Sequence, residues 1–191
     1  MALSAVPGPV PVSLRAASAA DAGLLYAWRG EPSVRRHQPL QEASLPDLRA
    51  DLSRQRPADL YRSRGDRYQW IVLADRQPVG WITLAITSWE QGVAEVGYAL
   101  TTAAQGRGLM APALEQLVAE LFGRTAIDRL EARCSVDNVA SAHVLERCGF
   151  RREGLLRGYF QLAGRRVDNW IYAILRTDFF APSGERPREP R

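Results

Sequence analysis

The chain has 191 residues, of which 46% are hydrophobic and 24% are charged, and its formal net charge is +4. This length and apolar content predict one globular domain with its own core rather than two domains. The arginines are interleaved with acidic residues and form no dense run with aromatic residues between them. We therefore interpret the positive charge as a solvated surface and disfavour a nucleic-acid-binding protein.

The two ends of the chain are rich in proline and lack apolar periodicity. We expect flexible tails at 1–11 and 181–191 and a single domain over 12–180. The sequence shows no signal peptide and no apolar run of the ~18–20 residues needed to cross a bilayer, which favours a soluble, cytoplasmic protein without a membrane partner. Cys134 and Cys148 form no metal-binding or disulfide pattern, so we expect two reduced thiols and no metal site.

The N-terminal part of the chain predicts one strand followed by two helices. Residues 12–18 alternate as a strand does, residues 18–30 carry an apolar helical stripe, and residues 44–55 begin with a serine at a capping position. The polar stretches at 30–43 and 56–67 indicate loops.

After residue 67 the apolar residues follow the two-residue period of strands, and then helices and strands alternate along the chain. Three β-branched and aromatic runs parted by short polar turns predict an antiparallel meander. These runs lie at 68–74, 78–87 and 93–100. A helix, a strand, a helix and a hairpin follow at 108–124, 127–135, 138–150, and 151–160 paired with 165–176. This order predicts a mixed α/β domain, α+β-like, with a central sheet and helices on both faces.

The stretch QGRGLM, residues 105–110, lies between the last strand of the meander and the long helix. The first turn of a helix carries unpaired N–H groups and the positive end of the helix dipole, and glycine lets an anionic group approach the backbone. The stretch therefore predicts either a phosphate site, suited to a pyrophosphate, or a tight turn from strand to helix. It has neither the residues of a P-loop nor the spacing of the dinucleotide fingerprint.

Two motifs make the chain similar to the GNAT acetyltransferases. Gln105 and Gly108 match the Q/R-x-x-G-x-G/A motif after the fourth strand of that family, and Met110 stands at its last position. That Met, together with CSVDNVASAHVLERCGFRREGLLRG at 134–158, resembles the RimJ/RimL-type branch. The matching residues in this second motif are Asn138, Ser141, Gly149, Phe150, Glu153 and Gly154. The resemblance covers residues 12–177.

The resemblance implies the GNAT fold, in which a mostly antiparallel sheet opens between splayed fourth and fifth strands and acetyl-CoA lies in the gap. It implies that backbone N–H groups of the glycine loop hold the pyrophosphate and that the end of the fourth strand pairs with the pantetheine arm. The residues assigned to the cofactor are Tyr98, Ala99, Leu100, Gln105, Gly106, Arg107, Gly108, Leu109, Met110, Asn138 and Ser141. Arg107 either adds a charged contact or is solvated. For Asn138 we favour a contact with the cofactor over capping of the helix.

Acetyl transfer from a thioester to an amine needs a polarised carbonyl, a neutral amine and a proton for the leaving thiolate. The family implies that backbone N–H near Leu100 polarises the carbonyl. Glu95 on the fourth strand is the leading candidate for the base, the alternatives being a solvent-facing residue, a structural ion pair or a water relay. Many family members place a Tyr on the late helix to protonate the thiolate. Leu145 takes that position here, so Ser141 is the replacement candidate, unless it only packs or contacts the pantetheine.

The acceptor side carries fewer signals. RimL-like enzymes place a Glu where this chain has Tyr159 and Phe160, so a role on ribosomal proteins does not follow from the resemblance. Residues 30–67 are expected to line the acceptor site, and Trp89 is a candidate for its border.

We therefore predict an acetyl-CoA-dependent N-acetyltransferase that moves an acetyl group directly to a peptide N-terminus or a small amine. A non-catalytic acyl-CoA-binding or regulatory domain that keeps the cofactor loop is the alternative. The expected partners are acetyl-CoA and the amine acceptor, and the sequence leaves a homodimer open. The two histidines, His37 and His143, are expected to take no part in the chemistry.

Overall fold

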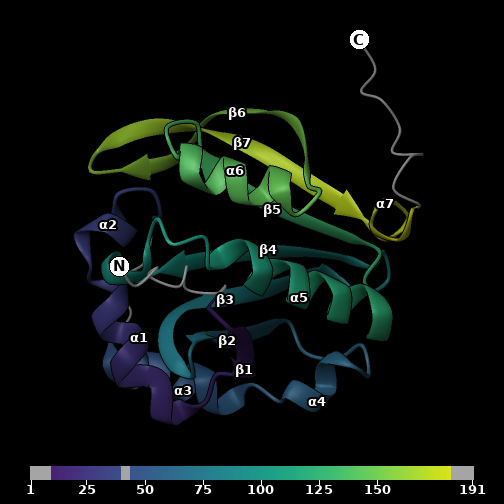
Figure 1. The fold of residues 1–191 in the computed structure, drawn as a ribbon, viewed down its shortest axis with the longest axis horizontal. Coiled ribbons are helices and arrows are strands. Elements are labelled where there is room, and N and C mark those ends of the chain that lie inside the picture. The colour runs from purple at the N-terminus through teal and green to yellow at the C-terminus, as the bar shows by residue number, and fades with distance from the viewer. Residues whose placement is uncertain (1–9, 40–43, 182–191) are drawn as a thin grey trace, which may run out of the picture.

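The computed structural model describes residues 10–39 and 44–181, so the expected tails fall almost entirely outside the described residues. Seven strands form a sheet in the order β1-β2-β3-β4-β5-β7-β6 (Figure 1). Within the described ranges, no helix is both long and apolar enough to cross a membrane.

All neighbouring strands of the sheet are antiparallel except β4 and β5, which run parallel. The strands are β1 (Val12–Ala16), β2 (Arg67–Ala74), β3 (Gln77–Ser88), β4 (Val93–Leu100), β5 (Arg129–Ser135), β6 (Arg151–Leu162) and β7 (Arg165–Leu175). The predicted mixed α/β class with a mostly antiparallel sheet is confirmed. The predicted strands recur close to their expected bounds, although the first ends at Ala16 rather than residue 18.

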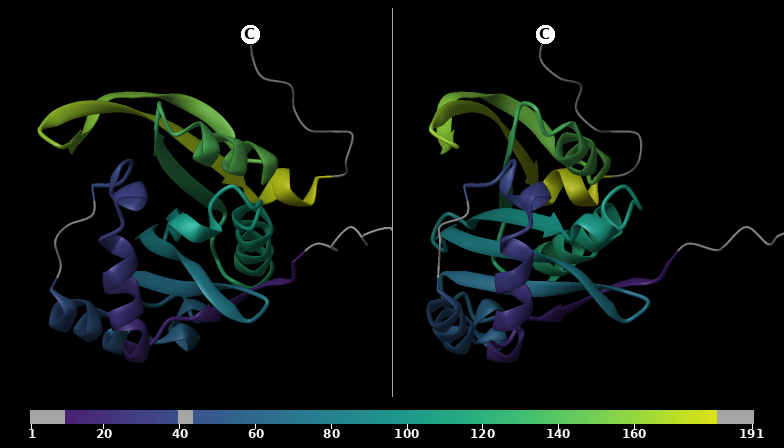
Figure 2. Two further views of the ribbon diagram at one scale, coloured as in Figure 1. Left: turned by 60° about the vertical axis from the view of Figure 1, so that its left-hand side comes forward. Right: turned by 90° about the vertical axis from the view of Figure 1, so that its left-hand side faces the viewer.

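Helices cover both faces of the sheet (Figure 2). They are α1 (Ala22–Arg29), α2 (Pro32–Arg35), α3 (Leu45–Arg54), α4 (Pro57–Leu60), α5 (Met110–Arg124), α6 (Val139–Arg147) and α7 (Arg176–Phe180), with 3-10 turns η1 (Ala19–Asp21) and η2 (Thr102–Ala104). On one face, α5 and α6 pack on the main core. On the other face, α1 and α3 cover a second core, where Trp28 stacks on Trp81 with ring centroids 6.2 Å apart.

Two short helices lie in stretches that the sequence indicated as loops. The loop prediction is wrong at α2 and α4, each of which begins with a proline in its first turn. Proline suits this position because its φ is already helical and its missing N–H has no partner there anyway. A helix of one turn has no repeating apolar stripe, so sequence periodicity does not reveal it.

The strands β4 and β5 part in the middle of the sheet. Their parallel pairing covers only Val93–Val96 of β4 and Arg129–Ala132 of β5. Beyond that point, Arg133–Ser135 continue alongside β7, while Gly97–Leu100 stay with β3. The divergence is visible in Figure 1 and confirms the splayed strands that the resemblance implied.

Candidate active site

The parting exposes one edge of β4 to the space between the diverging strands. The N–H of Thr101 donates to the Val79 carbonyl oxygen at 2.9 Å, so the odd-numbered backbone groups at this end of β4 face β3. The N–H and C=O groups of Tyr98 and Leu100 therefore face the parting. Ala99 does not: its carbonyl oxygen lies 2.3 Å from where a Cβ on Gly80 of β3 would sit. The assignment of Ala99 to pantetheine pairing is thus not supported.

Side-chain amides occupy both carbonyl groups on this edge. Gln38 Nε2 donates to the Tyr98 oxygen at 2.6 Å, and Gln105 Nε2 donates to the Leu100 oxygen at 3.1 Å. An extended chain that carries amide groups would meet the same carbonyls as a new strand does. The free edge of β4 can therefore pair with an extended ligand. In this structure the amides of Gln38 and Gln105 donate hydrogen bonds to its carbonyl oxygens instead.

The glycine loop lies where β4 leads into α5. Gly106 and Gly108 have φ of +72° and +70°, which L side chains rarely adopt. A Cβ at either position would meet nothing within 4 Å, so these glycines are required by the backbone conformation and leave open space in front of it. The side chains of Leu109 and Met110 are buried, so only their backbone can contact a ligand. The loop therefore makes the tight turn that the sequence offered as one alternative, and the phosphate site stays a prediction.

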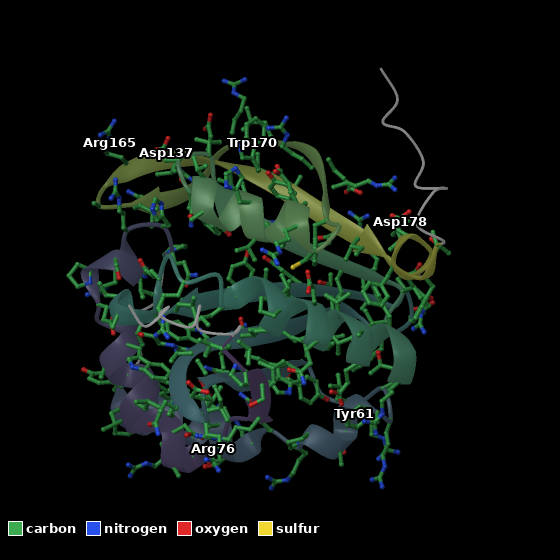
Figure 3. The ribbon with its side chains drawn as sticks, in the orientation of Figure 1. Tyr61, Arg76, Asp137, Arg165, Trp170 and Asp178 are labelled. Carbon is green, nitrogen blue, oxygen red and sulfur yellow. The ribbon has the colours of Figure 1, made fainter. Side chains whose placement is uncertain are left out.

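The segment 31–38 is hydrogen-bonded to the turn that follows the C-terminal end of β4. Glu31 Oε2 accepts from the Thr102 N–H at 2.7 Å, and the hydroxyls of Ser33 and Thr102 lie 2.7 Å apart. At its far end, burial lowers the pKa of His37, with the Asp137 carboxylate acting against it. Asp137 lies just before α6 (Figure 3). The segment therefore extends from the end of β4 toward the start of α6.

Ser141 and Tyr98 meet at the parting from different elements. The Tyr98 hydroxyl on β4 lies 3.0 Å from Ser141 Oγ and 3.2 Å from the Ser141 carbonyl oxygen on α6. Asn138 caps α6 by accepting from the Ser141 N–H at 3.1 Å, so the capping role is present, and the favoured contact with the cofactor stays a prediction. Burial raises the pKa of the Cys134 thiol to about 11, although the Ser141 hydroxyl acts against this shift. These groups therefore lie together on the α5 and α6 side of the sheet.

Glu95 lies on the opposite face of β4, because both neighbouring side chains on the strand are buried in the α5 core. Its carboxylate forms an ion pair with Arg133, the first β5 residue beyond the paired region. Arg133 also contacts Glu131 at 3.3 Å and lies over the Tyr159 ring, 5.4 Å from its centroid. Burial lowers the pKa of Arg133, but Glu95, Tyr159 and Glu131 together outweigh it, so the net shift is upward. The ion pair considered from sequence is therefore present, with Glu95 still 35% exposed.

The comparisons with known proteins agree with this geometry. Residues 12–151 match the family model described as an acetyltransferase (GNAT) domain.

The chain belongs to the GNAT acetyltransferases. It is 24% identical over 168 residues to the uncharacterized N-acetyltransferase p20 of Bacillus licheniformis, covering 88% of this chain and 94% of that protein. The structure of RimL, a ribosomal L7/L12 α-N-protein acetyltransferase in complex with coenzyme A, matches with a TM-score of 0.75 at 25% identity, covering 87% of this chain and 96% of the other. A dodecameric spermidine N-acetyltransferase from Vibrio cholerae shares the fold, with a TM-score of 0.73 at 20% identity over 90% and 98% of the two chains.

These findings confirm the GNAT family, its RimJ/RimL-type branch and the prediction of an N-acetyltransferase. Acetyltransferases of this family use acetyl-CoA, which confirms the cofactor that the resemblance implied. The acceptor differs among the neighbours, since one is named for a ribosomal protein and another for spermidine.

The structure also places three further residues that the sequence analysis named. Leu145 is fully buried in the main core, and His143 is exposed on α6. Trp89 donates to the Gly65 carbonyl oxygen at 2.7 Å and lies in the turn before β4, at the strand end opposite to the parting. Trp89 is therefore not a border of the site.

Sequence reasoning missed three contributions to the site: the Gln38 amide, the Tyr98 hydroxyl and the Arg133 guanidinium. Gln38 lies in a stretch without periodic pattern, so no signal marked it. Tyr98 was assigned only through its backbone, although an aromatic hydroxyl on the fourth strand was visible in the sequence. Arg133 follows Glu131 by two positions, a spacing that places both on one face of a strand.

Proposed function

We propose that this acetyltransferase transfers the acetyl group of acetyl-CoA directly to a primary amine, either the α-amine of a peptide N-terminus or a small-molecule amine. The observation that carries the proposal is the parting of β4 and β5, with the free edge of β4 leading into an open glycine loop at the start of α5. An extended thioester donor with a pyrophosphate needs both of these features at one end of a strand.

The chain offers groups that fit each part of acetyl-CoA. The carbonyls of Tyr98 and Leu100 face the parting and suit the amide N–H groups of a pantetheine arm. The loop from Gly106 to Met110 leads into the N-terminus of a 15-residue helix, where an anion is stabilised, and the space beside Gly106 and Gly108 is open. Arg107 is exposed beside this loop and adds a positive charge near the phosphates.

The same edge supplies polarisation of the thioester carbonyl. Since the N–H groups of Tyr98 and Leu100 face the parting, either one can donate to the oxygen that gains charge as the amine attacks. Ser141, on the opposite side of the opening, gives its hydroxyl proton to the departing sulfur. Asn138 fixes the backbone of Ser141 at the first turn of α6, which holds this hydroxyl in place.

Glu95 is proposed as the group that takes the proton from the attacking amine. Glu95 lies one residue before Val96, the last residue of β4 that pairs with β5, and it is on the face of the sheet away from α5. Its ion pair with Arg133 orients the carboxylate. An α-amine with a pKa of ~8 is already partly neutral at physiological pH, so a weak base suffices for it, whereas a lysine at ~10.4 needs far more assistance.

A coenzyme A release assay with a panel of amines tests this function. We expect release with peptides that carry a free α-amine or with small amines, together with addition of one acetyl group to the acceptor. Tight binding of acetyl-CoA without transfer to any amine in the panel would contradict a catalytic role.

A further inference from the structure

We propose that the Tyr98 hydroxyl is a positioning residue that holds Ser141 in the state in which it can protonate the leaving thiolate. The inference rests on the proposed function and adds a side-chain role to a residue assigned so far only through its backbone. It is carried by one contact, in which the phenol of β4 reaches both the hydroxyl and the carbonyl oxygen of Ser141 on α6.

The hydrogen-bonding options of this contact are limited. A carbonyl oxygen only accepts, so Tyr98 donates either to the Ser141 carbonyl at 3.2 Å or to Ser141 Oγ at 3.0 Å. In the first arrangement, the Ser141 hydroxyl donates to the Tyr98 oxygen and its proton is occupied. In the second, Ser141 Oγ accepts from Tyr98 and its own proton is free for a third partner. The second arrangement is the one that serves acid catalysis.

Tyr98 is suited to act as a permanent donor. Its ring packs on the main core, and burial raises the pKa of its hydroxyl well above the usual value near 10. It therefore keeps its proton at any pH at which the enzyme works, and it does not compete as a base. The nearby Cys134 thiol also stays neutral, because its pKa is raised to about 11. Ser141 thus faces a fixed O–H donor and no competing anion among these groups.

The proton balance of the step follows from this arrangement. As the C–S bond breaks, the electron pair goes to sulfur, and the Ser141 hydroxyl proton moves onto it to give the free thiol. The oxygen left on Ser141 accepts the Tyr98 O–H bond, which lowers the cost of its transient negative charge. The attacking amine loses one proton to the base, and Ser141 regains its proton from solvent.

The test compares Tyr98→Phe with Tyr172→Phe. Tyr172 is a matched control because it also loses a buried hydroxyl bonded to α6, where it donates to Glu146 at 3.1 Å. We expect Tyr98→Phe to lower kcat about tenfold, below the general range for a group that transfers the proton itself. The dissociation constant for acetyl-CoA should stay within about twofold, as measured by calorimetry. Tyr172→Phe should leave kcat unchanged, and its melting temperature should be similar to that of Tyr98→Phe.

A double-mutant cycle with Ser141→Ala separates this inference from the proposed function. If Tyr98 acts through Ser141, the double variant should be no slower than Ser141→Ala alone, within about twofold. Full additivity, an unchanged kcat in Tyr98→Phe, or an effect confined to acetyl-CoA affinity would overturn the positioning role. A wild-type kcat in Ser141→Ala would instead remove Ser141 from the mechanism, and an inactive wild type would overturn the proposed function together with this inference.

Discussion

The side-chain amide of Gln38 donates a hydrogen bond to the backbone carbonyl oxygen of Tyr98 at 2.6 Å, joining residues 60 positions apart in the sequence. The contact ties the segment expected to line the acceptor site to the edge of β4 proposed to pair with the pantetheine arm. Gln105 occupies the next carbonyl of that edge in the same way. The donor and acceptor halves of the site are therefore linked through one strand edge.

Removing the Gln38 amide should strengthen donor binding. In the wild type, the pantetheine amide must displace the Gln38 amide from the Tyr98 carbonyl oxygen, whereas in Gln38→Ala this oxygen is free to accept from the pantetheine. The hydrogen bond that no longer has to be broken is worth a net ~0.5–1.5 kcal/mol. We expect the dissociation constant for acetyl-CoA to fall by about two- to tenfold in titration calorimetry. Gln91→Ala, in the exposed turn before β4, is the control and should bind as the wild type does. Weaker binding in Gln38→Ala would show that this amide supports the cofactor instead.

A bulky residue in the glycine loop should prevent cofactor binding. Gly108→Trp fills the open space before the helix start, and we expect acetyl-CoA affinity to fall at least tenfold. The substitution also strains the backbone by ~1–2 kcal/mol, because φ is +70°. Gly164→Trp matches this strain, since Gly164 has φ of +78° and open surroundings in the β6–β7 turn. Both variants should lose similar thermal stability, while only Gly108→Trp loses the ligand. Equal affinities of the two variants for acetyl-CoA would show that the phosphates bind outside the glycine loop.

Most of the fold was predictable because its elements carry long periodic patterns. The meander and the helix α5 each repeat an apolar pattern over many residues, and the splaying of the fourth and fifth strands followed from the family resemblance. The one-turn helices α2 and α4 escaped notice because they are too short for a repeat. Their prolines mark helix starts as well as loops, so composition alone did not distinguish the two.

The site was predictable where it depends on backbone and less so where it depends on side-chain partners. The glycine loop and Ser141 were found from motifs, since their spacing is local. The ion pair between Glu95 and Arg133 depends on the register of β4 against β5, which no local pattern encodes. The contacts of Gln38 and Tyr98 likewise join distant segments that only the folded chain brings together.

The pH dependence of a Glu95 variant tests its role as base. Glu95→Gln should lower the transfer rate to an α-amine more than tenfold at pH 7, the low end of general-base effects being about a hundredfold. At pH 9 the acceptor, with a pKa of ~8, deprotonates without assistance, so much of the rate should return. Glu131→Gln is the control because this carboxylate also bonds Arg133, and it should change the rate little at either pH. A rate equal to wild type for Glu95→Gln at pH 7 would exclude Glu95.

Asp21 is expected to stabilise the start of α1. It accepts from Arg15 at 2.6 Å and from the Ser18 N–H at 2.8 Å, and the Arg15 bond lowers its pKa against the effect of burial. A lowered folded pKa means that the stabilisation is complete above the unfolded pKa of ~3.9 and is lost as the pH falls through the folded pKa. Asp21→Asn should reduce the free energy of unfolding by ~1–3 kcal/mol at pH 7.

Urea unfolding at two pH values measures this contribution. The difference between wild type and Asp21→Asn should shrink as the pH falls below the unfolded pKa of ~3.9 and continues down through the lowered folded pKa of Asp21. Asp51→Asn is the control, since the Asp51–Arg54 pair is exposed and should contribute less than ~1 kcal/mol. Equal losses for the two variants at pH 7 would contradict a special role for Asp21.

The account as a whole depends on acetyl transfer to an amine that is partly neutral near physiological pH. The direct measurement incubates the enzyme with acetyl-CoA and two peptides that differ only in the reactive amine they offer. One peptide has a free N-terminus and no lysine, and the other has a blocked N-terminus and one internal lysine; a set of small amines is run in parallel. We predict coenzyme A release and one added acetyl group, by mass spectrometry, on the free N-terminus or on a small amine, and little on the lysine peptide. Acetylation of the internal lysine alone, or bound acetyl-CoA with no acetylated product, would contradict the account.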